Sequence, residues 1–137
     1  MESAMTAPGL TTLPSNHGPR DTMNRLEAAV KAKGMTVFAR IDHAAGADSV
    51  GLALLPTELL IFGNASAGTL LMQSARTIAI DLPLKAMVWQ DPAGRTWLCY
   101  NDPAWLARRH GLGGTTDAVL AQMTRVLAEV VKAVTGD

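Results

Sequence analysis

Cysteine is almost absent from this sequence: among 137 residues there is one, Cys99, inside the apolar run Trp97-Leu98-Cys99-Tyr100. A single cysteine excludes an intramolecular disulfide, so the chain must rely on a buried core, as proteins of reducing compartments do. No base stands beside Cys99 in the sequence, and a thiol without such a neighbour is rarely activated. The pattern therefore favours a small buried hydrophobe over a reactive thiol.

An excess of charge of either sign is also absent. The chain carries 12 Lys and Arg residues against 12 Asp and Glu residues, which gives a formal net charge of zero. Without net positive charge there is no global field that would attract nucleic acid or an anionic membrane surface. We therefore predict no nucleic-acid partner.

Long apolar runs are missing as well. The densest apolar stretch, residues 52–62, is broken by Pro56 and Glu58, whereas a transmembrane helix needs about 20 mostly apolar residues. The first ten residues carry Glu2 and no basic residue, unlike the start of a signal peptide. These features predict no membrane partner and a soluble cytoplasmic protein, in which residues 1–9 form a flexible leader.

What the sequence does contain is a succession of short strand-like and helix-like segments. Period-two alternation, apolar runs and turn residues predict strands at residues 10–13, 35–41, 57–62, 86–90 and 96–100. Helical periodicity and capping residues predict helices from Asp21 or Thr22 to Gly34, at about 66–76, from Asp102 to Gly111 and at about 116–135. A helical turn is expected at residues 44–50, and irregular structure between the second helix and Leu84.

This order of elements predicts a fold class. Strands that follow one another closely, with helices before, between and after them, are typical of an α+β protein. We expect a single domain over residues 10–137, with an antiparallel sheet of four to five strands, helices packed on one face and a long amphipathic helix at the end. Seven Met and three Trp residues in so short a chain also favour an apolar interface, and hence a homodimer.

Three segments resemble a known family. They are Ala39-Arg40-Ile41-Asp42-His43-Ala44-Ala45-Gly46-Ala47, Leu59-Leu60-Ile61-Phe62-Gly63-Asn64 followed by Gly68-Thr69, and Asp81-Leu82-Pro83-Leu84-Lys85. Their residue types and spacing resemble domain-of-unknown-function family 302 over about residues 10–112. The resemblance implies a saddle-like α+β fold similar to that of TATA-binding protein, often in dimers, and it implies no reaction. The chain departs from the family pattern at Ala65, where proline usually follows Gly-Asn.

Strong catalytic motifs are absent, because the sequence holds no HExxH, CxxC, Gly-x-Ser-x-Gly or phosphate-loop pattern. We predict no metal site and no cofactor, and no catalytic residue is assigned. The best candidates for a ligand site are Asp42 and His43 after one strand, Gly63 and Asn64 after another, and Lys85 at the start of a third. If these strand ends converge, they supply a carboxylate, an imidazole and an ammonium group around one concavity.

Each of these residues also has a structural interpretation. Asp42 would cap the turn that follows it, His43 would bond a backbone carbonyl, and Lys85 would shield a strand. The loop from Gly63 to Thr69 precedes a helix, where free N–H groups can hold an anion, although many helices begin this way without binding one.

The sequence alone is compatible with three functions. The leading one is a non-catalytic module that binds a small ligand or a protein partner and acts as a homodimer. The alternative is a small-molecule enzyme in which His43 is the general acid or base, with Asp42 and Lys85 orienting the substrate. The third is a structural domain whose apolar surface serves assembly alone.

Overall fold

The computed structural model describes residues 7–137, so residues 1–6 of the predicted leader lie outside the described range. The elements follow one another as β1 (Leu10–Ser15), α1 (Pro19–Ala32), β2 (Thr36–Asp42), α2 (His43–Ser49), β3 (Thr57–Gly63), α3 (Ala65–Ser74), η2 (Arg76–Ile80), β4 (Leu84–Gln90), β5 (Thr96–Asn101), α4 (Pro103–His110), η3 (Gly114–Thr116) and α5 (Asp117–Thr135). Here η marks a 3-10 helix. All five predicted strands are present, and the region that was expected to be irregular contains η2.

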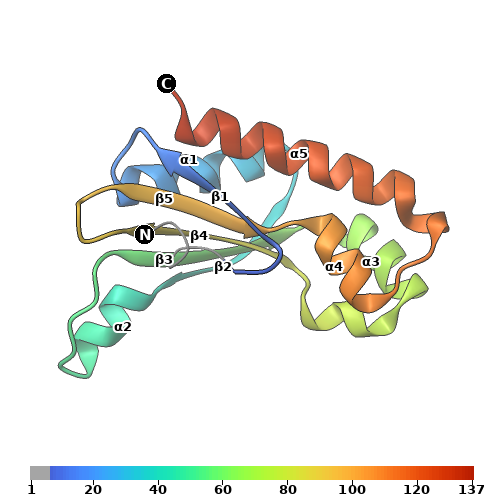
Figure 1. The fold of residues 1–137 in the computed structure, drawn as a ribbon, viewed down its shortest axis with the longest axis horizontal. Helices are drawn as coiled ribbons and strands as arrows, with labels where there is room; N and C mark the ends of the chain where they lie inside the picture. Colours follow the sequence, from blue (N-terminus) through green and yellow to red (C-terminus); the bar gives the residue numbers. More distant parts are fainter. Residues whose placement is uncertain (1–6) are drawn as a thin grey trace.

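The strands form one antiparallel sheet with the order β1-β5-β4-β3-β2 (Figure 1). The hairpin of β4 and β5 is confirmed, with Gln90 opposite Thr96 across the turn. β1 is an edge strand and has a neighbouring strand on one side only. It can therefore accommodate Pro14, because proline has no N–H and a strand with two neighbours would need that donor. The predicted α+β class is therefore confirmed.

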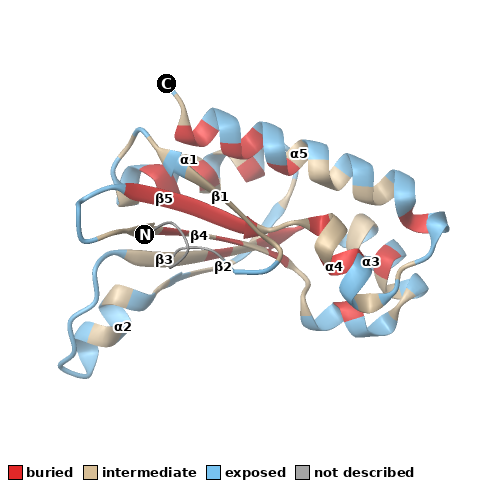
Figure 2. Ribbon diagram, viewed as in Figure 1, coloured by how far each residue is buried: buried red, intermediate tan, exposed pale blue. Residues whose placement is uncertain are grey.

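Helices α1 and α5 cover one face of the sheet, and the main core lies between these two layers (Figures 1 and 2). Its fully buried side chains come from both layers and include Met23, Leu26, Val30, Leu60, Phe62, Leu98 and Val131. Burying an aliphatic or aromatic side chain of this size stabilises a fold by about 1.5–3 kcal/mol. A smaller cluster around Leu71, Ile78 and Leu106 holds α3, η2 and α4 together at one end of the sheet.

Helix α1 begins earlier than the sequence predicts. The expected caps were Asp21 or Thr22, but the helix begins at Pro19 and its N-cap residue is Gly18. Proline suits the first helical position because its missing N–H has no intrahelical partner there. Thr22 is buried inside the first turn, where its hydroxyl lies 2.7 Å from that of Ser15.

The last helix, α5, is long and amphipathic, as the sequence predicts. It spans 19 residues, its N-cap residue is Thr116, and Leu127, Val130, Val131 and Val134 are buried on one side. The opposite side is largely exposed, as the alternation of colours along α5 shows (Figure 2). None of the helices within residues 7–137 combines the length and apolar character that a membrane crossing requires.

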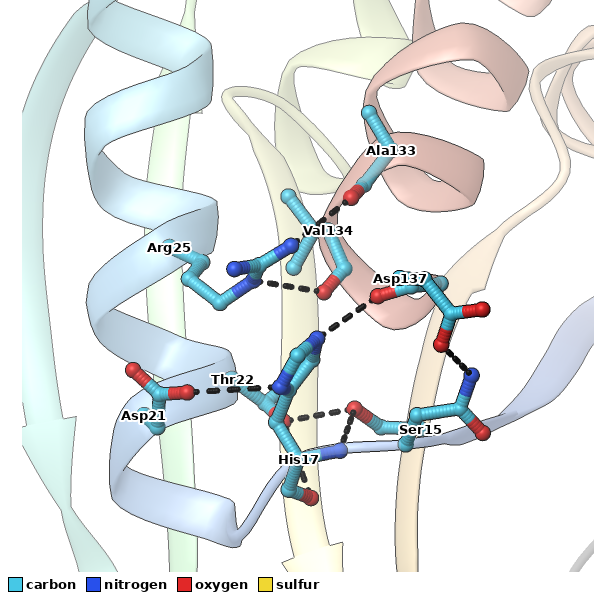
Figure 3. A network of polar contacts seen from close by, with 10 residues as sticks. Ser15, His17, Asp21, Thr22, Arg25, Ala133, Val134 and Asp137 are labelled. Atoms are coloured by element: carbon cyan, nitrogen blue, oxygen red, sulfur yellow. Dashed lines mark hydrogen bonds and ion pairs between the residues drawn. The ribbon is translucent and has the colours of Figure 1, made fainter.

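A polar network fixes the C-terminal end of α5 against the start of α1 (Figure 3). Arg25 donates through Nε to the carbonyl oxygen of Val134 at 3.0 Å and through Nη2 to that of Ala133 at 3.1 Å. His17 Nε2 lies 2.6 Å from the carbonyl oxygen of Gly136. The last carbonyl groups of a helix have no intrahelical donor, so these two side chains supply partners that the helix itself lacks.

The strand register gives the sheet two distinct ends. Thr36 of β2 lies opposite Gly63 of β3, and Asp42 lies opposite Glu58. We call these the Gly63 end and the Asp42 end. Helices α3, η2 and α4 gather at the Gly63 end, whereas α2 follows Asp42 at the other end (Figure 1).

The second face of the sheet is not covered by α1 or α5, and we call it the open face. Its strand residues include Leu59, Ile61, Met87 and Trp89, which alternate with the core residues of the same strands. Cys99 also belongs to this face but is 2% exposed, and burial raises the pKa of its thiol to about 11. This environment agrees with the predicted buried cysteine. The thiolate is the reactive form of cysteine, and a raised pKa disfavours it.

The packing of α5 on the sheet yields a stability prediction. Leu127 is 2% exposed, so Leu127→Ala should lower the free energy of unfolding by about 2–5 kcal/mol through lost contacts and a residual cavity. Urea denaturation of the purified protein measures this. Arg125→Ala, at an exposed position of the same helix, should change stability by no more than about 0.5 kcal/mol. A similarly small loss for Leu127→Ala would contradict its place in the core.

Candidate functional site

The five predicted site residues do not share one concavity. Asp42 and His43 stand at the Asp42 end of the sheet, whereas Gly63 and Asn64 stand at the Gly63 end. Lys85, opposite Ile61, is also near the Gly63 end. The convergence that a shared site of all five residues requires does not occur, because adjacent strands run antiparallel and the exit of β2 lies beside the start of β3, not beside its exit.

At the Asp42 end, both residues have structural contacts. Asp42 is the N-cap of α2, and its Oδ1 accepts a hydrogen bond from the N–H of Ala45 at 2.9 Å. Its other oxygen lies 3.9 Å from the guanidinium of Arg20. His43 is the exposed first residue of α2. This geometry gives Asp42 the capping role that the sequence left open, and it removes the basis for an enzyme in which His43 and Lys85 work together.

Next to Asp42, Arg40 is fully engaged by its own partners. It donates to both carboxylate oxygens of Glu58 at 2.8 and 3.3 Å, to Glu27 at 3.1 Å and to Asn24 at 2.8 Å. The hydrogen bond from Lys31, and to a smaller extent the one from Arg40, lowers the pKa of Glu27. The hydrogen bond to Glu58 raises the pKa of Arg40. This cluster ties α1 to β2 and β3, and its charges are already paired.

Lys85 lies at the Gly63 end but on the open face of the sheet. Its Nζ donates to the carbonyl oxygen of Pro83 at 3.2 Å. Leu84 and Ala86, its neighbours in β4, point into the core on the opposite face. Lys85 is therefore close to Gly63 along the sheet yet separated from the helix-covered side by the sheet itself.

A cavity of about 570 Å³ lies at the Gly63 end, between α3, α5 and the ends of β2 and β3. Gly63 and Asn64 line it, so two of the five predicted residues belong to it. The remaining wall comes from Lys33, Met35, Phe38, Ala65, Ser66, Ala67, Gly68, Thr69, Leu70, Met72, Leu82, Pro83, Leu84, Val119, Gln122, Met123, Val126 and Leu127.

Local structure explains how this wall is shaped. The register of β2 shifts between Val37 and Ala39, and the extra residue, Phe38, lines the cavity while 56% exposed. A bulge of this kind redirects a side chain away from the regular alternation. Asn64 is the N-cap of α3 and accepts a hydrogen bond from the N–H of Ala67 at 3.1 Å. It thereby fixes the start of α3 along the cavity wall.

The chemistry of the wall is mainly apolar. Methionine, leucine, valine and phenylalanine side chains predominate, with Lys33 as the charged group and Ser66, Thr69 and Gln122 as further polar groups. Lys33 Nζ lies 3.3 Å from Glu129 on α5. The lining residues, all within the described part of the chain, include no Asp, Glu, His or Cys. Such a wall can hold an apolar molecule and orient it through a few polar contacts, but it offers no imidazole or carboxylate for proton transfer.

The sequence could not reveal most of this wall. Met35 lies just before β2, Met72 in α3 and Met123 in α5, and methionine in a single sequence is equally consistent with core filling. The bulge at Phe38 interrupts an alternation that read as a regular strand. The one usable signal was the Gly63-Asn64 exit, because loops and element ends carry binding groups more often than element interiors do.

Comparison with known proteins shows which family the chain matches and which solved structure it resembles. The family described as "Domain of unknown function DUF302" matches residues 11–130. The crystal structure of an uncharacterized conserved DUF302 protein from Bacillus stearothermophilus has a TM-score of 0.80, is 21% identical, and covers 92% of this chain and 98% of that chain. At this identity the likeness concerns the fold.

Curated relatives come from Brucella. "Fluoride-specific ion channel FluC 1" of Brucella suis biovar 1 (strain 1330) is 50% identical over 129 residues, which are 94% of this chain and 51% of that protein. "Fluoride-specific ion channel FluC 2" of Brucella melitensis biotype 1 (strain ATCC 23456 / CCUG 17765 / NCTC 10094 / 16M) has the same identity, over 48% of its length. The chain thus spans about half the length of these relatives. With the family match over residues 11–130 and the shared fold, the chain belongs to the DUF302 family.

Proposed function

We propose that this chain is a module that binds a small apolar ligand in the cavity at the Gly63 end, where the binding is non-catalytic, and that it acts as a homodimer. We also propose that it works in the cytoplasm. The observation that carries the binding proposal is the cavity itself, with Gly63 and Asn64 in its wall.

The size and exposure of the cavity support a ligand. Ligand pockets commonly measure about 300–1,000 Å³ and are lined mainly by apolar side chains, and this cavity of about 570 Å³ falls in that range. Phe38 and Leu70 line it while 56% and 49% exposed. Covering such side chains with a ligand removes apolar surface from water, which contributes roughly 25 cal/mol per Å². Binding therefore has a physical driving force.

The same wall supports a non-catalytic role for the cavity. General acid–base catalysis needs a positioned side chain such as His, Asp or Glu within hydrogen-bond reach of the substrate. The cavity wall has none of these, and its one ammonium group, on Lys33, already faces Glu129. The chemistry available at this site is therefore recognition.

The open face and an adjoining arm support the homodimer. The arm, residues 43–56, consists of α2 and the loop after it, and it projects from the body at the Asp42 end (Figure 1). Four of its side chains are large, apolar and 45–69% exposed: Val50, Leu52, Leu54 and Leu55. Contiguous apolar patches on a soluble protein commonly mark an interface.

Charge also favours a second copy as the occupant. Among the described strand residues that point to the open face, Lys85 is the single charged one. Interface cores are depleted of charged residues and enriched in aromatic residues and Met. Met87 and Trp89 are partly exposed on this face, and Trp89 stacks on the buried Trp97 with ring centroids 6.5 Å apart. A twofold dimer would bury the same patch on both subunits.

The Brucella relatives favour a second candidate function. Nearly the whole chain matches about half of proteins named as fluoride-specific ion channels, at 50% identity. We propose as the alternative that this chain associates with a fluoride channel and modulates its flux. The ligand cavity is compatible with either role.

The cavity proposal predicts ligand-dependent stabilisation. A metabolite panel screened by thermal denaturation should contain an apolar compound that raises Tm, and at about 100 times its Kd the ligand stabilises the native state by about 2.7 kcal/mol. Gly68→Leu should abolish this shift, because a Cβ at Gly68 lies 3.7 Å from Met72 and 3.9 Å from Leu82, two residues of the wall. The matched control is Gly46→Leu in α2, which meets open space. Equal ligand shifts in both variants would argue against binding in the cavity.

The homodimer proposal predicts a mass of two chains in solution. Sedimentation of the purified protein at tens of micromolar should give the dimer, and replacing Leu52 and Leu54 together by Lys should give the monomer by placing charges in the apolar patch. Ile80→Lys, at a 75% exposed apolar position on η2, should leave the dimer intact. A parent protein that sediments as a monomer would rule the dimer out.

The channel proposal predicts an effect on fluoride flux. The half of the Brucella suis relative that this chain does not match, reconstituted in liposomes, should show a different fluoride efflux rate when this chain is added. An unrelated protein of similar size is the control. If neither the efflux rate nor co-elution with the reconstituted protein changes, the association is absent.

A further inference from the structure

A second group of side chains at the Gly63 end lies outside the cavity wall. Thr77 of η2, Asp81 just after η2, and His110 at the end of α4 meet across the contact between these two helices. Thr77 Oγ1 lies 2.9 Å from His110 Nδ1, and His110 Nε2 lies 2.5 Å from Asp81 Oδ2. A hydroxyl, an imidazole and a carboxylate are thus joined in that order.

The carboxylate fixes which nitrogen of His110 carries the proton. An ionised carboxylate can only accept hydrogen bonds, so the neutral imidazole must place its N–H at Nε2, facing Asp81. Nδ1 then holds a lone pair, and the hydroxyl of Thr77 donates to it. The geometry therefore directs the Thr77 proton at a base that a third group orients, which is the arrangement of an activated nucleophile.

Arg109 holds the carboxylate of Asp81 in place. Its Nη1 donates to both oxygens of Asp81, at 3.0 and 2.9 Å. The side chains of Asp81 and His110 are 16% and 7% exposed, so little water competes for their contacts. Asp81 thus contacts both Arg109 and His110, so the carboxylate that orients the imidazole is itself fixed in position.

The outer surface of η2 offers room for a substrate. Thr77 is exposed, and in a 3-10 helix residues three apart lie on the same face. The residue three positions on is Ile80, which is 75% exposed. A nucleophilic hydroxyl and an exposed aliphatic side chain on one face suit an ester with an apolar acyl group.

We propose that Thr77, His110 and Asp81 form an acyl-transfer site for such esters, independent of the ligand cavity. Thr77 Oγ1 attacks the ester carbonyl carbon while its proton passes to His110 Nδ1. The tetrahedral intermediate collapses, the bond from the acyl carbon to the leaving oxygen breaks, and the leaving alcohol takes the proton from His110. Water then attacks the acyl-threonine in the same way and releases the carboxylic acid. Thr77 and His110 are the catalytic residues, and Asp81 and Arg109 position them.

The test uses the purified full chain with p-nitrophenyl butyrate. We expect release of p-nitrophenol and a transient butyryl group, found by mass spectrometry on the peptide that contains Thr77. Thr77→Val should abolish both, Thr77→Ser should retain both, and His110→Asn should slow acylation by about 10²-fold or more, the usual contribution of a general base. Thr115→Val, at another exposed threonine, is the matched control and should behave as the parent.

Several outcomes would overturn the proposal. They are no p-nitrophenol release above the buffer rate, butyryl groups on lysines in place of Thr77, or equal rates for Thr77→Val and Thr115→Val. Because the side chain of His110 is only 7% exposed, His110→Asn is compared with the parent only after its melting curve shows a folded protein. If it does not fold, Thr77→Val and the location of the butyryl group decide the question.

Discussion

The packing of α1 and α5 on one face of the sheet is the constraint on which the rest of the structure depends. β1 and β2 are the two edge strands, and α1 joins them by crossing the covered face, with Met23, Leu26 and Val30 fully buried. The three remaining strands, β3, β4 and β5, lie between these two edges, and each pairs antiparallel with its neighbours. Because apolar burial is the main favourable term in folding, this layer determines which face is covered and which stays open.

That constraint also separates the possible functions in space. The covered face ends in the cavity where α5 extends beyond the sheet and α3 closes the other side. The arm at residues 43–56 stays accessible, with Leu52 and Leu54 exposed, whereas the open face is partly accessible, at side chains such as Met87. The small cluster around Leu71, Ile78 and Leu106 brings η2 against α4, and it is this contact that places Thr77 and Asp81 beside His110. The molecule thus presents three separate places for function, which are the cavity, the open face with the arm, and the contact between η2 and α4.

Two polar residues at strand ends have a structural role as helix caps. Asp42 and Asn64 both stand after a strand, and both accept a hydrogen bond from an N–H in the first turn of the next helix. Such capping stabilises a helix by about 1 kcal/mol, which accounts for their positions without any ligand. Asn64 lies at the cavity as well because the cavity is built beside the helix that it caps.

The sequence by itself determined the elements and the class of fold. Period-two alternation in β2, the turn residues between β4 and β5, the Asp102-Pro103 start of α4 and the stripe of α5 are local signals, since they depend on backbone geometry and on which side of an element is apolar. The tertiary structure alone decided how these elements are placed. The antiparallel register put Asp42 and Gly63 at opposite ends of the sheet, and packing between elements joined Thr77, Asp81 and His110 across more than 25 residues of sequence. Contacts of that kind arise from the packing of separate elements, and a single sequence holds no local signal for them.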